Sequence, residues 1–287
     1  MSNATGDAAM TTTATIYDSA APRRPIVDPF VNIWTNRRLI GLLVGRDLTL
    51  RYKRSVLGIW WTILNPLLTT AVYWFVFSAI FQRQGGDDAP FIVYLLSGTL
   101  LIASFFSQGS LAGGSSLIGS RSILSKIRVP GESFAVTAAL AAGVNFLIGL
   151  VMLAIIQLVT GWGIPWTVVL VPIPTIAMLF LVTGFGMLIA SAAIHFYDVL
   201  DFVRVIMQMA IWLVPTFYPI DIVPENLQVL IKVNPLYSYL VVFRGFMYEG
   251  EFAPTWNFVY MSASAIVILL LGVWVFSKSW KQAAVRL

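Results

Sequence analysis

The sequence predicts an all-α polytopic membrane protein with six transmembrane helices. The chain has 287 residues, of which 58% are hydrophobic and 11% are charged, and its mean hydropathy is +0.83. A water-soluble domain cannot bury that much apolar surface. Several uncharged stretches also exceed the roughly 20 residues that a helix needs to cross the hydrocarbon core. These two observations predict the class, and the distribution of basic residues, given below, predicts the number of spans.

Composition also excludes several kinds of site. The chain has no cysteine and one histidine, which leaves no ligand set typical of zinc and no cysteine nucleophile. We therefore expect no metal site. The net charge of +5 is explained by basic residues beside the spans, so nucleic acid is not an expected partner.

The first 57 residues predict two cytoplasmic segments. Residues 1–30 contain three prolines and no hydrophobic periodicity, which predicts a flexible tail. They also lack the apolar core of a signal peptide, so the first span is expected to act as an uncleaved insertion signal. In residues 31–57, Leu39, Leu43 and Leu50 share one helical face, which predicts an amphipathic interface helix along the membrane surface.

A basic collar precedes the first span. Because the positive-inside rule places lysine and arginine in the cytoplasm, the collar predicts a cytoplasmic N-terminus. The collar could also be a contact for another subunit; the second interpretation is that its charges only set the topology. The collar consists of Arg46, Arg51, Lys53 and Arg54.

The spans follow from the uncharged stretches between basic segments. The interval 133–197 contains no charged residue, which is long enough for two spans separated by the Gly-, Pro- and Trp-containing turn at 161–166. Of the 18 lysines and arginines, 15 fall in segments assigned to the cytoplasm, which supports six spans with both ends inside. The predicted spans are 58–81, 90–111, 134–158, 167–194, 205–220 and 253–276.

The segment between the last two spans is expected to enter the membrane and return. In residues 215–254, prolines and two basic residues divide the apolar sequence into pieces too short to cross. We therefore predict two short re-entrant helices on the outer side. The chain then ends in a basic cytoplasmic segment, 277–287.

Small residues and single polar residues have mostly structural interpretations. Gly109 and Gly113 form a GxxxG pair, and Gly184 and Gly186 lie inside the fourth span, so both pairs predict close helix packing. His195 is expected to be a loop or packing residue rather than a proton carrier. No phosphate-binding G-x-x-x-x-G-K-[ST] motif occurs, so this chain is not expected to bind ATP by a P-loop.

Aromatic residues are the candidate contacts for a cargo. Tyr73, Phe77 and Phe81 are spaced i, i+4, i+8 and share one face of the first span. Aromatic faces can stack on sugar rings without a charge on the cargo. The other interpretation is ordinary packing and an interfacial belt. The remaining members of this predicted conduit are Tyr94, Phe217 and Tyr218.

Four stretches of the chain, in this order, resemble the permease subunits of ABC-2 type exporters. The resemblance is greatest to permeases for O-antigen, capsule, teichoic acid or related cell-wall polysaccharides, and it covers residues 32–285. The third stretch departs from the family pattern near Pro130, where an aromatic residue and an arginine are usual. The stretches are RDLTLRYKRSVLGIWWTILNPLL, YLLSG, SKIRVPGES and FYPIDIVP followed by NPLYSYLVVFR.

The resemblance implies a transport subunit of the inner membrane rather than an enzyme. Two copies of the chain would form a channel at their interface, and two separate ATP-binding subunits would hold ATP and magnesium, with no cofactor in this chain. The cargo would be a polysaccharide linked to a lipid, with undecaprenyl pyrophosphate as the carrier. The residues implied to contact the ATP-binding subunit are the basic collar together with Arg121, Lys126 and Arg128.

Two other functions remain open at this point. A related permease could carry a drug, a lipid or a haem-like cargo. A membrane-bound glycosyltransferase or polymerase would need acidic residues on a cytoplasmic loop, for which Asp198 and Asp201 are the candidates.

Overall fold

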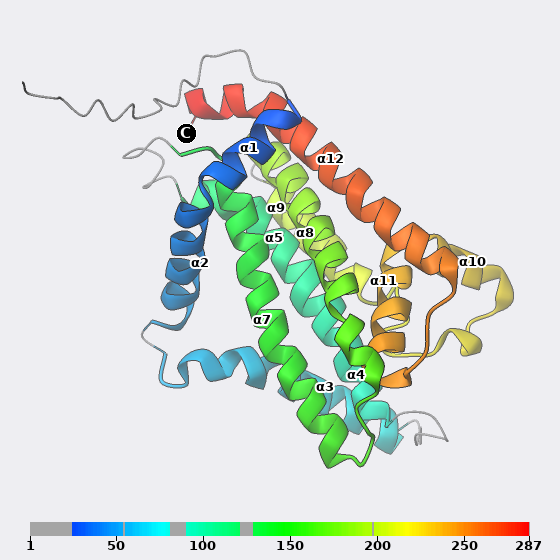
Figure 1. Ribbon diagram of the computed structural model, residues 1–287. Coiled ribbons are helices and arrows are strands. Elements are labelled where there is room, and N and C mark those ends of the chain that lie inside the picture. The colour runs from blue at the N-terminus through cyan, green and yellow to red at the C-terminus, as the bar shows by residue number, and fades with distance from the viewer. Residues whose placement is uncertain (1–24, 54, 81–89, 121–128, 197, 287) are drawn as a thin grey trace, which may run out of the picture.

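The computed structural model describes residues 25–53, 55–80, 90–120, 129–196 and 198–286, and the regular elements within these ranges are helices (Figure 1). Long helices run side by side through the molecule, and α8 contacts α5, α7 and α12. The helix that predicted span two forms is continuous, although its middle third is π-helical. The elements of this bundle are α4 (Phe91–Gly98), η3 (Thr99–Gln108), α5 (Gly109–Gly119), α7 (Glu132–Val159), α8 (Pro172–Ala193) and α12 (Thr255–Arg286).

Five helices within the described residues are long and apolar enough to cross a membrane. They match predicted spans one, two, three, four and six, so the all-helical, multi-pass membrane class is confirmed. Their bounds are Gly58–Ser78, Phe91–Gly119, Glu132–Val159, Trp166–Ala193 and Thr255–Trp280. The fourth of them includes η4 (Trp166–Leu170), which precedes α8.

Predicted span five is not one of these helices. The chain there forms α9 (Asp198–Ala210), whose 13 residues extend about 20 Å, less than the roughly 30 Å of a hydrocarbon core. Turns and bends follow from Ile211 to Tyr218, where Pro215 interrupts the backbone hydrogen bonding. The sixth crossing therefore stays a prediction.

The segment predicted as one interface helix is divided in two. Helix α1 (Val27–Thr35) crosses one end of the bundle, and α2 (Arg37–Tyr52) runs beside α7 (Figure 1). Asn36 lies at the break, where its side-chain Nδ2 donates to the Asn32 carbonyl at 2.8 Å. Of the predicted apolar face, Leu43 is buried whereas Leu50 is 51% exposed. The location of this segment at the membrane surface stays a prediction.

Helix α3 (Trp61–Phe75), with η1 (Gly58–Trp60) before it and η2 (Val76–Ile80) after it, runs crosswise to the bundle rather than along it (Figure 1). Gly58 has a φ of 51°, which turns the chain sharply at the entry to this helix. Of the residues in the most apolar stretch of Gly58–Ser78, only 6% are buried. Thr70 connects this helix to η3, because the Thr70 hydroxyl lies 3.1 Å from the hydroxyl of Thr99.

Two short helices lie between α9 and α12, as the sequence predicts. They are α10 (Glu225–Val233) and α11 (Pro235–Arg244), and α11 continues into η6 (Gly245–Glu249). The 3-10 turn η5 (Ile220–Ile222) precedes them. Helix α11 packs against α12 and α8. Their depth in the membrane stays a prediction.

Glycines allow the central helices to touch. A Cβ atom at Gly113 of α5 would lie 2.9 Å from the Cα atom of Gly186 in α8, closer than real Cβ contacts. Gly184, on the same helix, faces the backbone of α12 at Ile268 in the same way. The predicted role of these glycines in helix packing is confirmed.

We predict that Gly113→Ala destabilises the protein, because the added methyl group meets the α8 backbone rather than a side chain that can move. The expected loss is about 1–3 kcal/mol, seen as a lower melting temperature of the purified protein in detergent. Gly119→Ala is the matched control, since Gly119 ends the same helix and a Cβ there has open space. Equal melting temperatures for the two variants would contradict the packing argument.

Candidate functional site

Five of the six aromatic residues predicted to line a conduit lie in one cluster. The ring of Phe217 is 4.5 Å from that of Tyr73 and 6.4 Å from that of Phe77, between centroids. Tyr94 and Tyr218 pack against the same cluster. We call Tyr73, Phe77, Tyr94, Phe217 and Tyr218 the aromatic cluster. Phe81 lies outside the described residues.

Burial differs within the aromatic cluster. Phe217 is fully buried, at 0% exposure, so in this structure it packs and presents no surface to a cargo. The other four side chains are partly exposed. Their role as a conduit stays a prediction, and the structure gives each of them a packing contact as well.

A buried arginine joins three distant parts of the chain beside the aromatic cluster. Arg244, at the end of α11, is 5% exposed. Its Nη1 donates to the Pro215 carbonyl at 2.9 Å, and its Nη2 donates to the Tyr94 carbonyl at 3.1 Å. Its Nε donates to Ser97 Oγ at 3.1 Å. The guanidinium therefore ties α4 and the turn after α9 to α11.

Tyr94 contributes to this junction with both its ring and its hydroxyl group. Its ring lies under the guanidinium, with Arg244 Cζ 3.6 Å from the centroid, which is a cation–π contact. Its hydroxyl is 2.7 Å from the Pro215 carbonyl and 2.6 Å from the Tyr218 carbonyl, so the one O–H can donate to either. We call Arg244, Tyr94 and Ser97 with the carbonyls they bind the arginine junction.

The arginine junction brings together two of the four stretches that carried the family resemblance. YLLSG contributes Tyr94 and Ser97, and the fourth stretch contributes Arg244 and the Tyr218 carbonyl. The sequence analysis treated Arg244 only as a charge that shortens an apolar run. One signal could have identified this residue. Arg244 follows an apolar run and has no acidic neighbour within α11, so its guanidinium needs hydrogen-bond acceptors from other parts of the chain.

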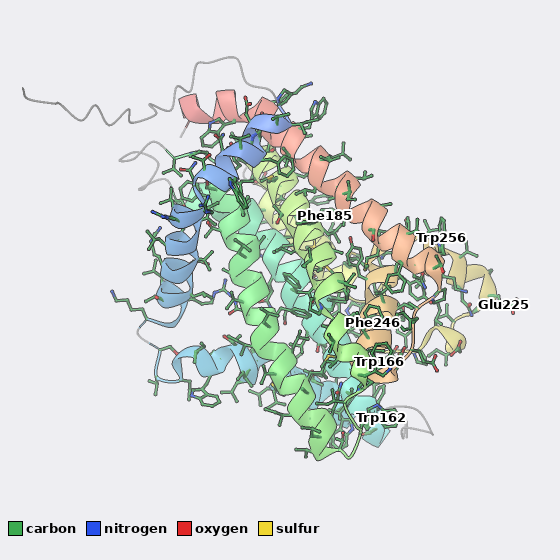
Figure 2. All side chains as sticks on the ribbon, viewed as in Figure 1. Trp162, Trp166, Phe185, Glu225, Phe246 and Trp256 are labelled. Atoms are coloured by element: carbon green, nitrogen blue, oxygen red, sulfur yellow. The ribbon has the colours of Figure 1, made fainter. Side chains whose placement is uncertain are left out.

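The short helices are fixed to the bundle by side chains that bind the carbonyls of η6. Trp162 Nε1 donates to the Tyr248 carbonyl at 2.9 Å, and Thr167 Oγ1 donates to the Phe246 carbonyl at 2.9 Å. Gln157 Nε2 donates to the Met247 carbonyl at 3.3 Å. Figure 2 shows Trp162, Trp166 and Phe246 together at the end of the bundle opposite to α1.

The collar residues that the structure describes lie on and just after α2. Arg46 and Arg51 are exposed and line a cavity of about 290 Å³ between α2, the end of α5 and the first turns of α7. Lys53 is exposed as well. Arg54, Arg121, Lys126 and Arg128, the other predicted contacts of an ATP-binding subunit, lie outside the described residues.

A buried carboxylate connects α1 to α7 at this end of the molecule. Glu132 begins α7 and is 1% exposed, and its Oε1 accepts from Asn32 Nδ2 at 2.8 Å. A carboxylate is stabilised there by the positive end of the helix dipole. The neighbouring Gly131 lies so close to the Trp280 ring of α12 that a side chain would not fit. The sequence analysis noted Glu132 only as the end of a span.

The remaining candidates have local contacts. His195 Nδ1 lies 3.0 Å from the Ser191 carbonyl at the end of α8, in agreement with a packing residue. Asp201 pairs with Arg204 at 2.5 Å on the exposed surface of α9. Within the described ranges, no group of three His, Cys, Asp or Glu residues could hold a metal ion.

Comparison with known proteins gives a consistent result. Residues 38–248 match the family described as ABC-2 type transporter. The chain is 24% identical over 254 residues to the O-antigen export system permease protein RfbA of Myxococcus xanthus, with 88% of this chain and 96% of the relative covered. It is 26% identical over 251 residues to RfbA of Klebsiella pneumoniae, covering 84% and 91%.

A capsule protein is similar over the same region. The chain is 26% identical over 247 residues to the capsule polysaccharide export inner-membrane protein CtrC of Neisseria meningitidis serogroup A, covering 83% of this chain and 89% of the relative. The family match includes Arg244 and the residues whose oxygens it binds, whereas Asn32, the partner of Glu132, lies before the matched residues.

We predict that Arg244→Met strongly destabilises the protein, because the substitution leaves buried carbonyls without donors. Hydrogen bonds to a charged group contribute about 1.5–3 kcal/mol each, so a loss of about 3 kcal/mol or more is expected in thermal unfolding in detergent. The control is Arg204→Met, which removes an exposed arginine and is expected to cost at most about 1 kcal/mol. Similar melting temperatures for the two variants would show that the arginine junction contributes little.

Proposed function

Because the chain belongs to the ABC-2 type transporter family, we propose that it is the permease subunit of an ATP-driven exporter that moves a lipid-linked polysaccharide across the cytoplasmic membrane. The observation that carries this proposal is the nearly full-length similarity to permeases named for O-antigen and capsule export. Undecaprenyl pyrophosphate is the proposed carrier lipid. The cytoplasmic position of both chain ends is part of the proposal.

The energy source lies on another subunit in this proposal. The sequence contains no P-loop lysine motif, so ATP and magnesium would be held by two copies of a separate ATP-binding subunit. Two copies of this chain would form the channel between them. The exposed apolar surface of α3 supports a partner on that side, because Leu68, Val72 and Phe75 are all more than half exposed in the single chain.

Helix α7 is suited to carry force from one end of the molecule to the other. Glu132, the first residue of α7, is hydrogen-bonded to α1, and Gln157, in the last turn of α7, is hydrogen-bonded to η6. A rigid helix fixed at both ends transmits a displacement along its axis without needing flexible links. We therefore place the contact with the ATP-binding subunit at α1 and α2 and the response at the short helices.

We expect a strain that lacks this protein to lose surface polysaccharide and to accumulate its lipid-linked precursor inside the cell. Expression of the native chain should restore the polysaccharide, as measured by gel analysis of surface glycans and by extraction of the carrier lipid. Normal surface polysaccharide in the deletion strain, with loss of resistance to a drug or a change in an exported lipid, would contradict the proposed cargo.

We also predict that Glu132→Ala uncouples the transporter. The substitution removes the acceptor for Asn32 and so the buried bond between α1 and α7, worth about 1.5–3 kcal/mol as a charge-assisted bond. In the purified complex with its ATP-binding subunit, stimulation of ATP hydrolysis by the glycan should fall toward the basal rate. Asp201→Ala, an exposed carboxylate on α9, is the control and should retain stimulation. Full stimulation with Glu132→Ala would argue against this route of coupling.

A further inference from the structure

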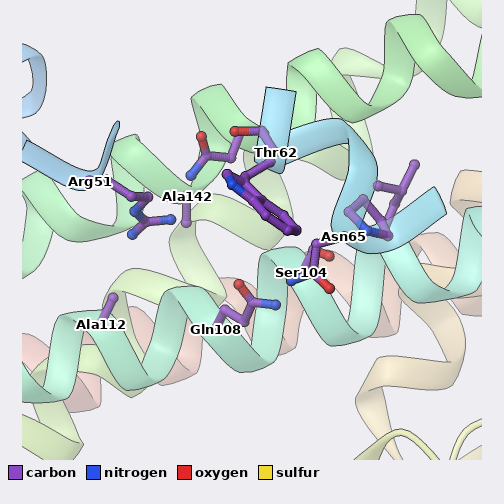
Figure 3. A pocket seen from close by; sticks show the side chains of 11 residues that line it. Arg51, Thr62, Asn65, Ser104, Gln108, Ala112 and Ala142 are labelled. Atoms are coloured by element: carbon purple, nitrogen blue, oxygen red, sulfur yellow. The ribbon is translucent and has the colours of Figure 1, made fainter. Parts of the chain in front are cut away.

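A cavity lined by both polar and apolar side chains lies where α3 crosses η3 and α7 (Figure 3). Its volume is about 280 Å³, near the lower limit of roughly 300 Å³ that is usual for small-molecule sites. In Figure 3, Ser104 and Gln108 extend from one helix toward the segment that carries Thr62 and Asn65. Arg51 of α2 reaches the cavity from one side. Asn145 of α7 completes the polar lining.

These polar residues belong to four helices, and all but α2 are mostly apolar. Asn145 lies halfway along α7, about 20 Å from either end at 1.5 Å per residue. Gln108 lies inside the 29-residue apolar helix Phe91–Gly119 and is exposed in the single chain. Asn65 is exposed on α3, directly before Pro66. Three helices thus each bring one carboxamide to the same cavity.

Gln108 indicates a polar occupant, because it is exposed inside an apolar helix. A polar side chain inside the hydrocarbon region is costly unless it faces a polar partner or a water-filled space. An apolar span gains nothing in stability from an exposed glutamine at its centre. The cavity is therefore expected to hold water or a polar ligand rather than lipid.

The chemistry of the lining selects the class of ligand. A carboxamide both donates and accepts hydrogen bonds, and so does a hydroxyl group. Three carboxamides with two hydroxyls therefore match a surface covered with hydroxyl groups. A phosphate site would need converging cations, whereas Arg51 is the one cation in the lining that the structure describes.

The cavity also shares helix α3 with one member of the aromatic cluster, Tyr73. Asn65, Thr69 and Tyr73 follow each other at intervals of four residues, so they share one face of α3. The distance along the helix from Asn65 to Tyr73 is about 12 Å. Helix α3 therefore carries amide contacts near its beginning and aromatic contacts near its end, both of which suit sugars.

From these observations we propose that Asn65, Gln108 and Asn145 form a contact site for the sugar hydroxyls of the cargo. The inference rests on the proposed function and deepens it, since it assigns residues that hold the glycan rather than the carrier lipid. The small volume means that the site holds a short part of a long chain at a time. The carboxamides hold the sugars by neutral hydrogen bonds, which are weak enough for the chain to move on.

The absence of cysteine from the chain makes a direct test available. Ser104→Cys introduces a single thiol into the cavity, and a charged thiosulfonate reagent measures its access to water. The full transporter is labelled in membranes from a strain that makes the glycan and from one blocked in glycan synthesis. We expect reaction in the blocked strain and about tenfold slower reaction in the other, if nine-tenths of the sites are occupied.

The control is Val267→Cys, on the exposed apolar surface of α12, which should react in neither strain. A Ser104→Cys thiol that is unreactive in both strains would overturn the proposal, because the cavity would not be open to water. A thiol that reacts equally in both strains, while glycan export still depends on the protein, would overturn the contact site and leave the proposed function intact. Normal export in the deletion strain would overturn the proposed function itself.

A second variant measures the contribution of one contact. Gln108→Leu should lower the rate of glycan export about threefold to tenfold, the effect of one lost hydrogen bond. Leucine is more favourable in a membrane helix than glutamine is, so poor insertion would not explain the loss. Gln108→Asn keeps the carboxamide and should restore part of the rate. Unchanged export with Gln108→Leu, at equal protein level, would overturn the role of this residue.

Discussion

The buried guanidinium of Arg244 supplies hydrogen-bond donors that a broken helix in a membrane requires. Hydrocarbon offers no hydrogen bonds, so each carbonyl that a broken helix frees must find a donor within the protein. The chain leaves helical geometry after Ala210, so the carbonyls of Pro215 and Thr216 no longer have a partner in a helix backbone. Arginine provides five donors in a fixed planar arrangement, so one side chain can serve several of these acceptors. The aromatic cluster forms around the turn that this arginine holds.

The same constraint shapes the attachment of the short helices. The π-helical segment η6 follows α11, and Gln157, Trp162 and Thr167 bind three successive carbonyls within it. The turn between α7 and α8, which supplies Trp162, is therefore more than a connection with interfacial tryptophans. It holds the segment that continues from Arg244, so the arginine junction and the η6 contacts stabilise one unit.

The molecule combines a tightly packed part and a loosely packed part. Glycine contacts bring the backbones of α5, α8 and α12 together, and Glu132 links α1 to the beginning of α7. By contrast, all but one residue of α3 are exposed or half-buried, and the helix crosses the bundle at the amide-lined cavity. In the proposed function, the tightly packed part would transmit force and the surfaces that the single chain leaves open would carry the cargo.

Local composition and motifs in order are enough to predict the membrane class, five of the spans, close packing at the glycine pairs and the family. The sequence also grouped five aromatic residues that the structure places in one cluster, although it could not decide between packing and a conduit. Tertiary structure alone decided the break at Asn36, the short α9, the role of Arg244 and the meeting of three carboxamides. The reason is that a hydropathy window treats every side chain as if it faced lipid, whereas the partners of Arg244 lie 29 and 150 residues away in the chain. Only the folded helices bring such groups within bonding distance.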